Sequence, residues 1–298
     1  VLVRMSRASG TLTLHVRVKA PDGTDLCEAY NSLPAEIESC TLPSTGIYTI
    51  LAGNLVGGNT GDYYLYLQRL NDPGGAVPIA FGQTHSGSIM PGEIDTYTFS
   101  AVAGDKVLVR MSRASGLITL EVRVFGLTGA LQCERYNSLP AEIESCTLPS
   151  TGTYTILADD KQGVNTSDYY LYLQRLNNPG GALPIGFGQT HSGSIMPGEI
   201  DTYTFSAVAG DKVLVRMSRA SGLITLEVRV FGLTGALQCE RYNSLPAEIE
   251  SCTLPSTGTY TILADDKQGV NTGDYLLYLQ RLNAPLTPYS VFMPSIHK

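Results

Sequence analysis

Six cysteines carry the clearest chemical signal in this sequence, and they form three pairs with one spacing: Cys27 and Cys40, Cys133 and Cys146, Cys239 and Cys252. A structural zinc site needs a second pair of ligands, and the four histidines fall at no matching spacing. Pairing at this spacing is the simplest arrangement, with free buried thiols as the alternative. A disulfide that closes a loop of about 14 residues contributes about 3 kcal/mol and persists only in an oxidising compartment. We therefore predict three local disulfides and an extracellular or cell-surface location.

Residues suited to catalysis give a much weaker signal. His85 and its copy His191 lie in the segment QTHSGSI, next to Ser86 and Ser192. Neighbours on a strand point to opposite faces, so adjacency does not make a triad, and we interpret these histidines as surface loop residues. Glu142 is two residues from Glu144, which fits the outward face of a strand better than a paired acid and base. No HExxH, phosphate-loop or dinucleotide motif occurs. The sequence predicts a protein that is not an enzyme.

Two tyrosines are candidates for contact with a partner. If Tyr169 faces the core of a strand, Tyr170 and Tyr172 lie on its outer face. Exposed aromatic side chains stack on sugars or pack against a neighbouring domain or subunit. The third copy of this strand has Leu276 in place of the first tyrosine. That replacement favours subunit packing over sugar binding.

The elements that position these residues recur every 106 residues without insertion or deletion. VLVRMSRASG begins at Val1, Val107 and Val213, and residues 81–166 recur letter for letter as residues 187–272. The first copy has no counterpart of residues 78–106. We predict a partial repeat at 1–72, complete repeats at 73–178 and 179–284, and a non-repeat tail at 285–298. Near-identical tandem copies supply length and valency rather than one pocket.

Within one copy the apolar residues alternate with period two, and Gly, Pro, Asn or Asp interrupt them every eight to twelve residues. Strands are expected near residues 79–81, 96–102, 106–113, 118–126, 131–136, 142–148, 153–158 and 169–176. In 106–113, Val107, Val109 and Met111 form one face, and we expect the other face to be exposed. Asp159 and Asp160 are expected in an acidic loop. These patterns predict an all-β chain of tandem, jelly-roll-like antiparallel β-sandwiches, with a rise of about 35 Å per compact domain.

Four motifs occur in a familiar order: E-x-D-x-Y-x-F at 93–99, A-G-D-K-V at 103–107, G-T-Y-T-I at 152–156 and D-Y-Y-L-Y-L at 168–173. This order resembles the bacterial pre-peptidase C-terminal domain over each complete repeat. The resemblance implies a jelly-roll-like sandwich of secreted proteins, which in some relatives binds calcium, collagen or polysaccharide. Its calcium ligands would fall on Glu93 and Asp95 and on their copies Glu199 and Asp201. The alternative is that these carboxylates bond to nearby groups of the fold, and no cofactor is then needed.

The charge is modest, with 20 basic and 27 acidic residues, and no run of like charge or long apolar segment occurs. Nucleic-acid binding and a membrane-spanning helix are therefore not expected. We predict an extracellular structural protein, a stalk, fibre or filament built from copies of itself. A binding module for polysaccharide or a collagen-like matrix protein, and an accessory region of a secreted hydrolase, are the alternatives.

The first repeat lacks the strands that residues 79–106 supply in the second, so its core is expected to be open at one edge. Either the sequence is cut from a longer array, or a neighbouring subunit donates strands. In the tail, Val291 and Met293 follow Ile185 and Phe187 by 106 residues. We predict that four residues of this tail contact another subunit: Tyr289, Val291, Phe292 and Met293.

Overall fold

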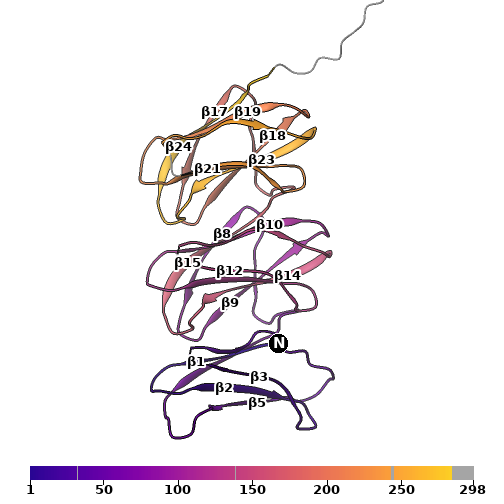
Figure 1. Ribbon diagram of the computed structural model, residues 1–298, viewed down its shortest axis with the longest axis vertical. Helices are drawn as coiled ribbons and strands as arrows, with labels where there is room; N and C mark the ends of the chain where they lie inside the picture. Colours follow the sequence, from indigo (N-terminus) through magenta and orange to yellow (C-terminus); the bar gives the residue numbers. More distant parts are fainter. Residues whose placement is uncertain (32, 138, 243–244, 284–298) are drawn as a thin grey trace, which may run out of the picture.

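A computed structural model describes residues 1–31, 33–137, 139–242 and 245–283. All regular elements in these ranges are strands, and they form three β-sandwiches stacked along one axis (Figure 1). This confirms the predicted fold class. We call residues 1–72, 73–178 and 179–283 repeats 1, 2 and 3. In these described ranges no helix is long and apolar enough to cross a membrane.

Repeat 2 shows the complete sandwich. Its strands are β7 (Val77–Pro78), β8 (Gln83–Ile89), β9 (Ile94–Ala101), β10 (Lys106–Arg113), β11 (Leu120–Phe125), β12 (Leu131–Asn137), β13 (Ala141–Thr147), β14 (Gly152–Asp160) and β15 (Ser167–Arg175). They form a four-stranded sheet in the order β13-β10-β15-β8 and a five-stranded sheet in the order β12-β11-β14-β9-β7. All pairs are antiparallel except the short β7, which runs parallel to β9. The jelly-roll-like interleaving places β10 and β15 side by side in one sheet and β11 and β14 in the other.

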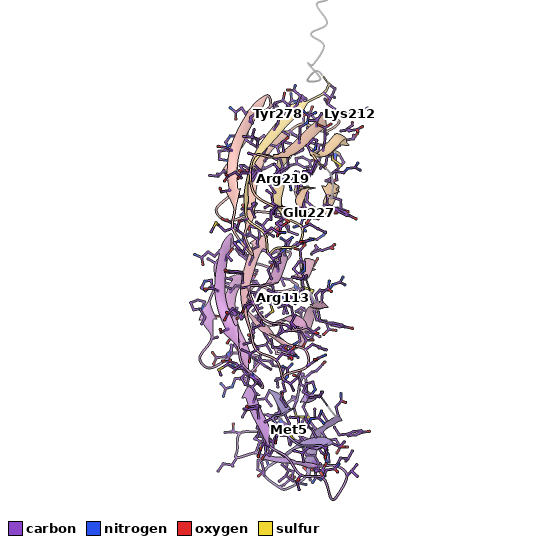
Figure 2. All side chains as sticks on the ribbon, turned by 90° about the vertical axis from the view of Figure 1, so that its left-hand side faces the viewer. Met5, Arg113, Lys212, Arg219, Glu227 and Tyr278 are labelled. Carbon is purple, nitrogen blue, oxygen red and sulfur yellow. A yellow bond between two sulfur atoms is a disulfide. The ribbon has the colours of Figure 1, made fainter. Side chains whose placement is uncertain are left out.

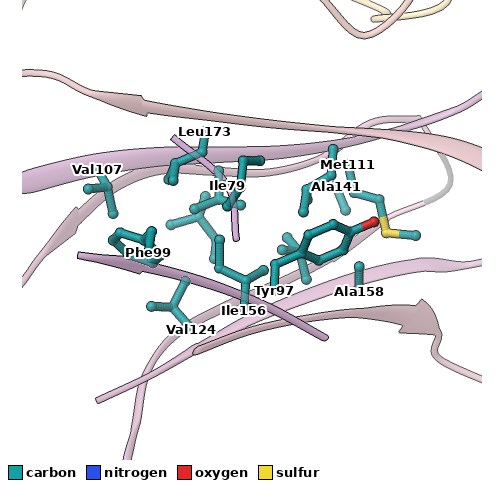
Figure 3. Packing of buried hydrophobic residues seen from close by; sticks show 14 of the residues in the cluster. Ile79, Tyr97, Phe99, Val107, Met111, Val124, Ala141, Ile156, Ala158 and Leu173 are labelled. Atoms are coloured by element: carbon teal, nitrogen blue, oxygen red, sulfur yellow. The ribbon is translucent and has the colours of Figure 1, made fainter. Parts of the chain in front are cut away.

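The core of repeat 2 lies between these two sheets. Alternate residues of each strand point inward, so Val107, Val109 and Met111 of β10 share one core with Val122 and Val124 of β11. Figure 3 shows Val107 and Met111 on one side of this core and Val124 on the other. Fully burying such side chains stabilises the fold by about 1.5–3 kcal/mol each. The disulfide Cys133–Cys146 joins β12 to β13 at the edge of the two sheets. Each sandwich is thus closed by packing on its inside and by a covalent bond at one edge.

Repeat 3 has the same elements: β16 (Leu183–Pro184), β17 (Gln189–Ile195), β18 (Ile200–Ala207), β19 (Lys212–Arg219), β20 (Leu226–Phe231), β21 (Leu237–Tyr242), β22 (Ala247–Thr253), β23 (Gly258–Asp266) and β24 (Gly273–Arg281). Repeat 1 has six strands: β1 (Leu2–Arg7), β2 (Leu14–Lys19), β3 (Asp25–Asn31), β4 (Ala35–Ile37), β5 (Thr49–Asn54) and β6 (Tyr63–Gln68). They make two three-stranded sheets, β4-β1-β6 and β3-β2-β5. Among the described strands, the two sheets of repeat 1 therefore end at β5 and β6. The corresponding sheets of repeat 2 continue beyond β14 with β9 and beyond β15 with β8.

Sheets also pack face to face across the boundary between repeats. The sequence KVLVRMSR forms both β10 and β19, but Leu108, Arg110 and Ser112 are buried in β10, whereas Leu214, Arg216 and Ser218 in β19 are not. The difference arises because the five-stranded sheet of repeat 3 covers the outer face of β10. The expectation of an exposed outer face is wrong for β10, and β11 is likewise buried on both faces. Because stacked sheets lie about 10 Å apart, the rise is about 20 Å per repeat rather than 35 Å.

Strand β8 was not expected, and the reading of its histidine as a loop residue is wrong. The segment QTHSGSI pairs along β15, and His85 lies with its ring edge-on to Tyr97 at a centroid distance of 5.9 Å. Only Ile89 of this strand is fully buried. An edge strand with small polar residues lacks the alternating apolar pattern by which strands are recognised.

Candidate functional site: the joints between repeats

A cluster of buried charges joins repeat 2 to repeat 3. Arg110 of β10 reaches Asp265 of β23, with 3.1 Å between Nη2 and Oδ1. Arg229 of β20 binds the other oxygen of Asp265 at 2.9 Å and also binds Glu142 of β13 at 2.5 Å. Glu142 in turn accepts a hydrogen bond from Arg110. The two arginines thus hold one carboxylate from each repeat between them.

Glu227 and Lys267 complete this cluster. Lys267 Nζ lies 2.7 Å from Glu227 Oε1, and Arg110 Nη2 lies 3.5 Å from Glu227 Oε2. The cluster therefore contains three cations and three carboxylates. Figure 2 shows Glu227 on the side of repeat 3 that faces repeat 2, whereas Tyr278 lies toward the far end. Charge balance allows these groups to be removed from water.

The joint between repeats 1 and 2 repeats the arrangement. Arg4 of β1 lies 3.0 Å from Asp159 Oδ1, and Arg123 lies 2.8 Å from Asp159 Oδ2. Both arginines also bind Glu36 of β4. Asp159 and its neighbour Asp160 are buried in β14, so the expectation that they form an acidic loop is wrong.

Apolar side chains surround each charged cluster. At the second joint Leu108, Tyr172 and Leu176 of repeat 2 pack against Phe231 and Leu263 of repeat 3. The hydroxyl of Tyr172 lies 3.2 Å from that of Thr202, and the side-chain amide of Gln174 donates to the Thr202 hydroxyl at 3.0 Å. Tyr172, predicted to contact another subunit, here packs against the next repeat of its own chain. The joint combines apolar burial with a fixed pattern of polar partners.

The two outer ends of the chain are chemically different. Repeat 3 keeps the joint residues Leu214, Arg216, Glu248 and Tyr278, and the side chain of Arg216 is 47% exposed beside Glu248. Repeat 1 lacks the complementary set on its outer sheet. His15, Lys19 and Gly53 stand where repeat 2 has Glu121, Phe125 and Asp159. An end-to-end contact of two chains through this type of joint would lack its central carboxylates and its aromatic contact.

The joints shift carboxyl pKa values in opposite directions. Burial and the nearby Asp159 raise the pKa of Glu121 to about 7, and burial with Asp265 does the same for Glu227. Burial alone would raise the pKa of Glu142, but Arg110 and Arg229 outweigh it and lower the pKa to about 2. The joints therefore hold some carboxyls that favour protonation and others that resist it.

Stability is expected to rise as the pH falls from 8 to about 5. A carboxyl whose pKa is raised on folding contributes stability below its unfolded value of 4.5, and this stability is lost as the pH rises through about 7. Glu142 acts oppositely, contributing above pH 4.5 and losing its contribution as the pH falls toward 2. Denaturation midpoints measured between pH 2 and 8 should peak near pH 5. Glu227→Gln should flatten the slope between pH 5 and 8, and an unchanged slope would contradict the assignment.

Repeat 1 presents an open apolar edge. Tyr63, Leu65 and Leu67 of β6 are 44–56% exposed, whereas their copies in β15 are fully buried under β8 and β9. The backbone of β6 pairs with β1 on one side only, among the described strands. An unpaired edge with apolar side chains is a template for a further strand.

The carboxylates considered as calcium ligands serve different partners. Glu93 accepts a hydrogen bond from the Met90 amide at 2.9 Å and closes a turn. Asp95 accepts one from the Tyr169 hydroxyl at 2.6 Å. Glu199 and Asp201 make the same bonds to Met196 and Tyr275. Among the described residues no group of three His, Cys, Asp or Glu side chains is placed to hold a metal.

The structure joins all six cysteines as Cys27–Cys40, Cys133–Cys146 and Cys239–Cys252. Tyr170 is half-buried at the second joint, against Gly198 of repeat 3. The predicted subunit contacts at Tyr289, Val291, Phe292 and Met293 lie outside the described residues. Sequence reasoning missed Arg110, Glu142, Glu227, Arg229 and Asp265 as joint residues.

Gly193 packs against the ring of Tyr275, which leaves no room for a side chain at this position. A Cβ at this position would lie 2.4 Å from the ring carbon and hydroxyl of Tyr275, whose hydroxyl binds Asp201. Gly193→Ala should therefore displace the ring and destabilise repeat 3 by about 1–3 kcal/mol, measured by chemical denaturation. Gly53→Ala is the matched control because a Cβ there meets nothing within 4 Å. Equal effects of the two substitutions would contradict the packing argument.

Together the joints define a tandem β-sandwich array with a polar lock at each boundary. No family model matches the sequence, and no curated protein matches it. The chain is similar to the pre-peptidase C-terminal domain of a collagenase from Bacillus anthracis, at 20% identity, with 35% of this chain and 98% of that chain covered and a TM-score of 0.30.

Two further similarities cover more of this chain at lower identity. Tandem CBM51 modules of a family 98 glycoside hydrolase from Streptococcus pneumoniae match at 10% identity over 68% of this chain and 85% of theirs, with a TM-score of 0.25. The CUB1-EGF-CUB2 domain of human MASP-1/3 matches at 9% identity over 66% and 99%, with a TM-score of 0.20.

Proposed function

We propose that this chain is an extracellular structural array, a rigid segment of a stalk, fibre or filament, with no catalytic role of its own. The observation that carries the proposal is the buried ion-pair cluster that occurs at both joints. A buried cluster of this kind contributes orientation more than stability, because only one relative placement of the repeats pairs every charge. Repeats joined in this way keep one relative orientation along the chain instead of bending freely at the joints.

Two features support the extracellular assignment and the array. Disulfides persist in an oxidising compartment, and the six cysteines form three of them. The sheets stack without interruption from repeat 1 to repeat 3 (Figure 1). Repeats that bury faces against their neighbours are the usual basis of elongated assemblies.

The chain is proposed to bind other copies of itself at the open edge of repeat 1. Among the described strands β6 pairs on one side only, so strand addition at this edge is the proposed contact between copies. The proposed donor is the segment Tyr289–Lys298 of a neighbouring copy, which keeps Val291, Met293 and His297 in phase with Ile185, Phe187 and His191. Donation by a separate chain gives an open, head-to-tail assembly.

A competition experiment tests the donor. A synthetic peptide with the sequence of residues 289–298 should shorten or dissolve polymers of the full chain, and deletion of these residues should prevent polymer formation. A peptide of the same composition in scrambled order is the control. Polymers that survive both treatments would exclude this donor, and the array itself is tested separately by imaging.

A further inference from the structure

A polar cleft lies at each joint between repeats, and no residue of the charged cluster lines it. The cleft between repeats 2 and 3 has a volume of about 690 Å³, and that between repeats 1 and 2 about 600 Å³. Their walls share residues 106 positions apart, among them Ser86 with Ser192 and Asp95 with Asp201. Both volumes fall within the roughly 300–1,000 Å³ typical of ligand sites. The feature is therefore a repeated property of the joint.

Asp201 is the principal acceptor in the larger cleft. Its Oδ2 accepts a hydrogen bond from Tyr275 at 2.6 Å, and Tyr275 is also bonded to Tyr203 at 2.7 Å. Its Oδ1 has no hydrogen-bond partner within the described part of the chain. Burial raises the pKa of Asp201 to about 6, which reflects a carboxyl lacking a cationic partner. This carboxyl is held in place by tyrosines, with one oxygen left for a ligand.

The remaining walls combine hydroxyl groups with apolar side chains. Ser86 and Ser192 are exposed, and no hydrogen bond of either hydroxyl occurs with another described residue. Leu183 and Met196 are 55% and 60% exposed, and Tyr170 is a further lining residue. Hydroxyl acceptors beside apolar surfaces match a ligand that has both hydroxyl groups and C–H faces.

The charge of the residues that line the cleft restricts the class of ligand further. Among the described residues that line the cleft, the charged ones are Glu199 and Asp201, and none is Lys or Arg. Phosphate, sulfate and uronate groups would meet only negative charge there, so anionic ligands are disfavoured. A neutral sugar can donate its hydroxyl protons to the free oxygen of Asp201 and lay its C–H face on Leu183 or Met196.

We propose that each cleft between repeats binds a neutral saccharide, with Asp201 and its copy Asp95 as the central hydrogen-bond acceptors. The two sites lie on one rigid chain, so a polysaccharide that spans both is bound with avidity. This inference does not depend on polymer formation by the protein. It adds a ligand to a joint whose charged cluster has a separate structural role.

The test uses the full chain and isothermal titration calorimetry. The probes are neutral hexasaccharides of glucose, mannose and N-acetylglucosamine, with oligogalacturonate as the anionic comparison. At least one neutral probe should bind, with oligogalacturonate at least tenfold weaker. Asp95→Asn with Asp201→Asn should weaken binding at least tenfold, because an amide oxygen still accepts from tyrosine but carries no charge to strengthen the ligand bond.

Two controls separate binding from folding. The denaturation midpoint of the double variant should stay at or above that of the wild type, and Ser86→Ala with Ser192→Ala, at exposed positions, should weaken binding without changing the midpoint. Tyr136→Ala, an exposed tyrosine outside both clefts, should leave affinity unchanged. Failure of every neutral probe, equal affinity of the Asn variants, or tighter binding of the anionic probe or of a lysine-containing peptide would overturn the proposal.

Discussion

Arg110→Ala is expected to destabilise the chain by about 3–5 kcal/mol, the usual cost of removing one partner of a buried ion pair. The guanidinium is fully buried and contacts Glu142, Glu227 and Asp265. Without it, three carboxylates keep one arginine and one lysine between them, so one buried negative charge is left without a partner. Chemical denaturation followed by tyrosine fluorescence and circular dichroism measures the loss.

Arg216→Ala is the matched control for this substitution. The residue occupies the same position in repeat 3, within the same sequence KVLVRMSR, but its side chain is about half exposed and pairs only with Glu248 among the described residues. Its loss should leave the free energy of unfolding close to the wild-type value, because exposed pairs contribute little. Similar losses for the two substitutions would mean that the joint is not formed in solution.

Removal of one disulfide is expected to have the second largest effect. Cys133→Ala with Cys146→Ala should lower the free energy of unfolding by about 3 kcal/mol, because the bond restricts the unfolded chain across a separation of 13 residues. Dithiothreitol should lower the midpoint of the wild type in the same direction and leave a variant without cysteines unaffected. Thiol titration of the unfolded, unreduced wild type should find no reactive cysteine.

Two results would contradict the disulfide prediction. Six titratable thiols in protein purified without reductant would show free cysteines, the alternative that the spacing leaves open. An unchanged midpoint after reduction would show that the bonds do not support the fold. The first result would also remove the main support for an extracellular location.

The sandwich could be predicted because its inside follows local rules. Alternation places Val107, Val109 and Met111 on one face, and turn residues divide the strands. β8 was missed because QTHSGSI covers the core with one isoleucine and leaves room at Gly87 for the Tyr169 ring. Such a strand is specified by its partner, not by its own pattern.

The joints could not be predicted by the same rules. Arg110 and Glu121 have the composition of an exposed face, and they are buried because another repeat covers them and supplies opposite charges, Asp265 for Arg110 and Arg4 for Glu121. A signal was nevertheless present in the differences between copies. His15 and Gly53 replace Glu121 and Asp159 on the outer sheet of repeat 1, which meets no other repeat in the described chain. The loss of both joint carboxylates on a sheet without a neighbour, beside their retention in repeats 2 and 3, is the signal that these positions belong to an interface.

Electron microscopy of native material tests the central claim most directly. A structural array predicts straight fibres whose axial period is a whole multiple of a rise of about 20 Å, set by two stacked sheets per repeat. Class averages should resolve repeats in one fixed relative orientation. Dispersed single chains whose repeats bend freely at the joints would contradict both the polar lock and the structural role.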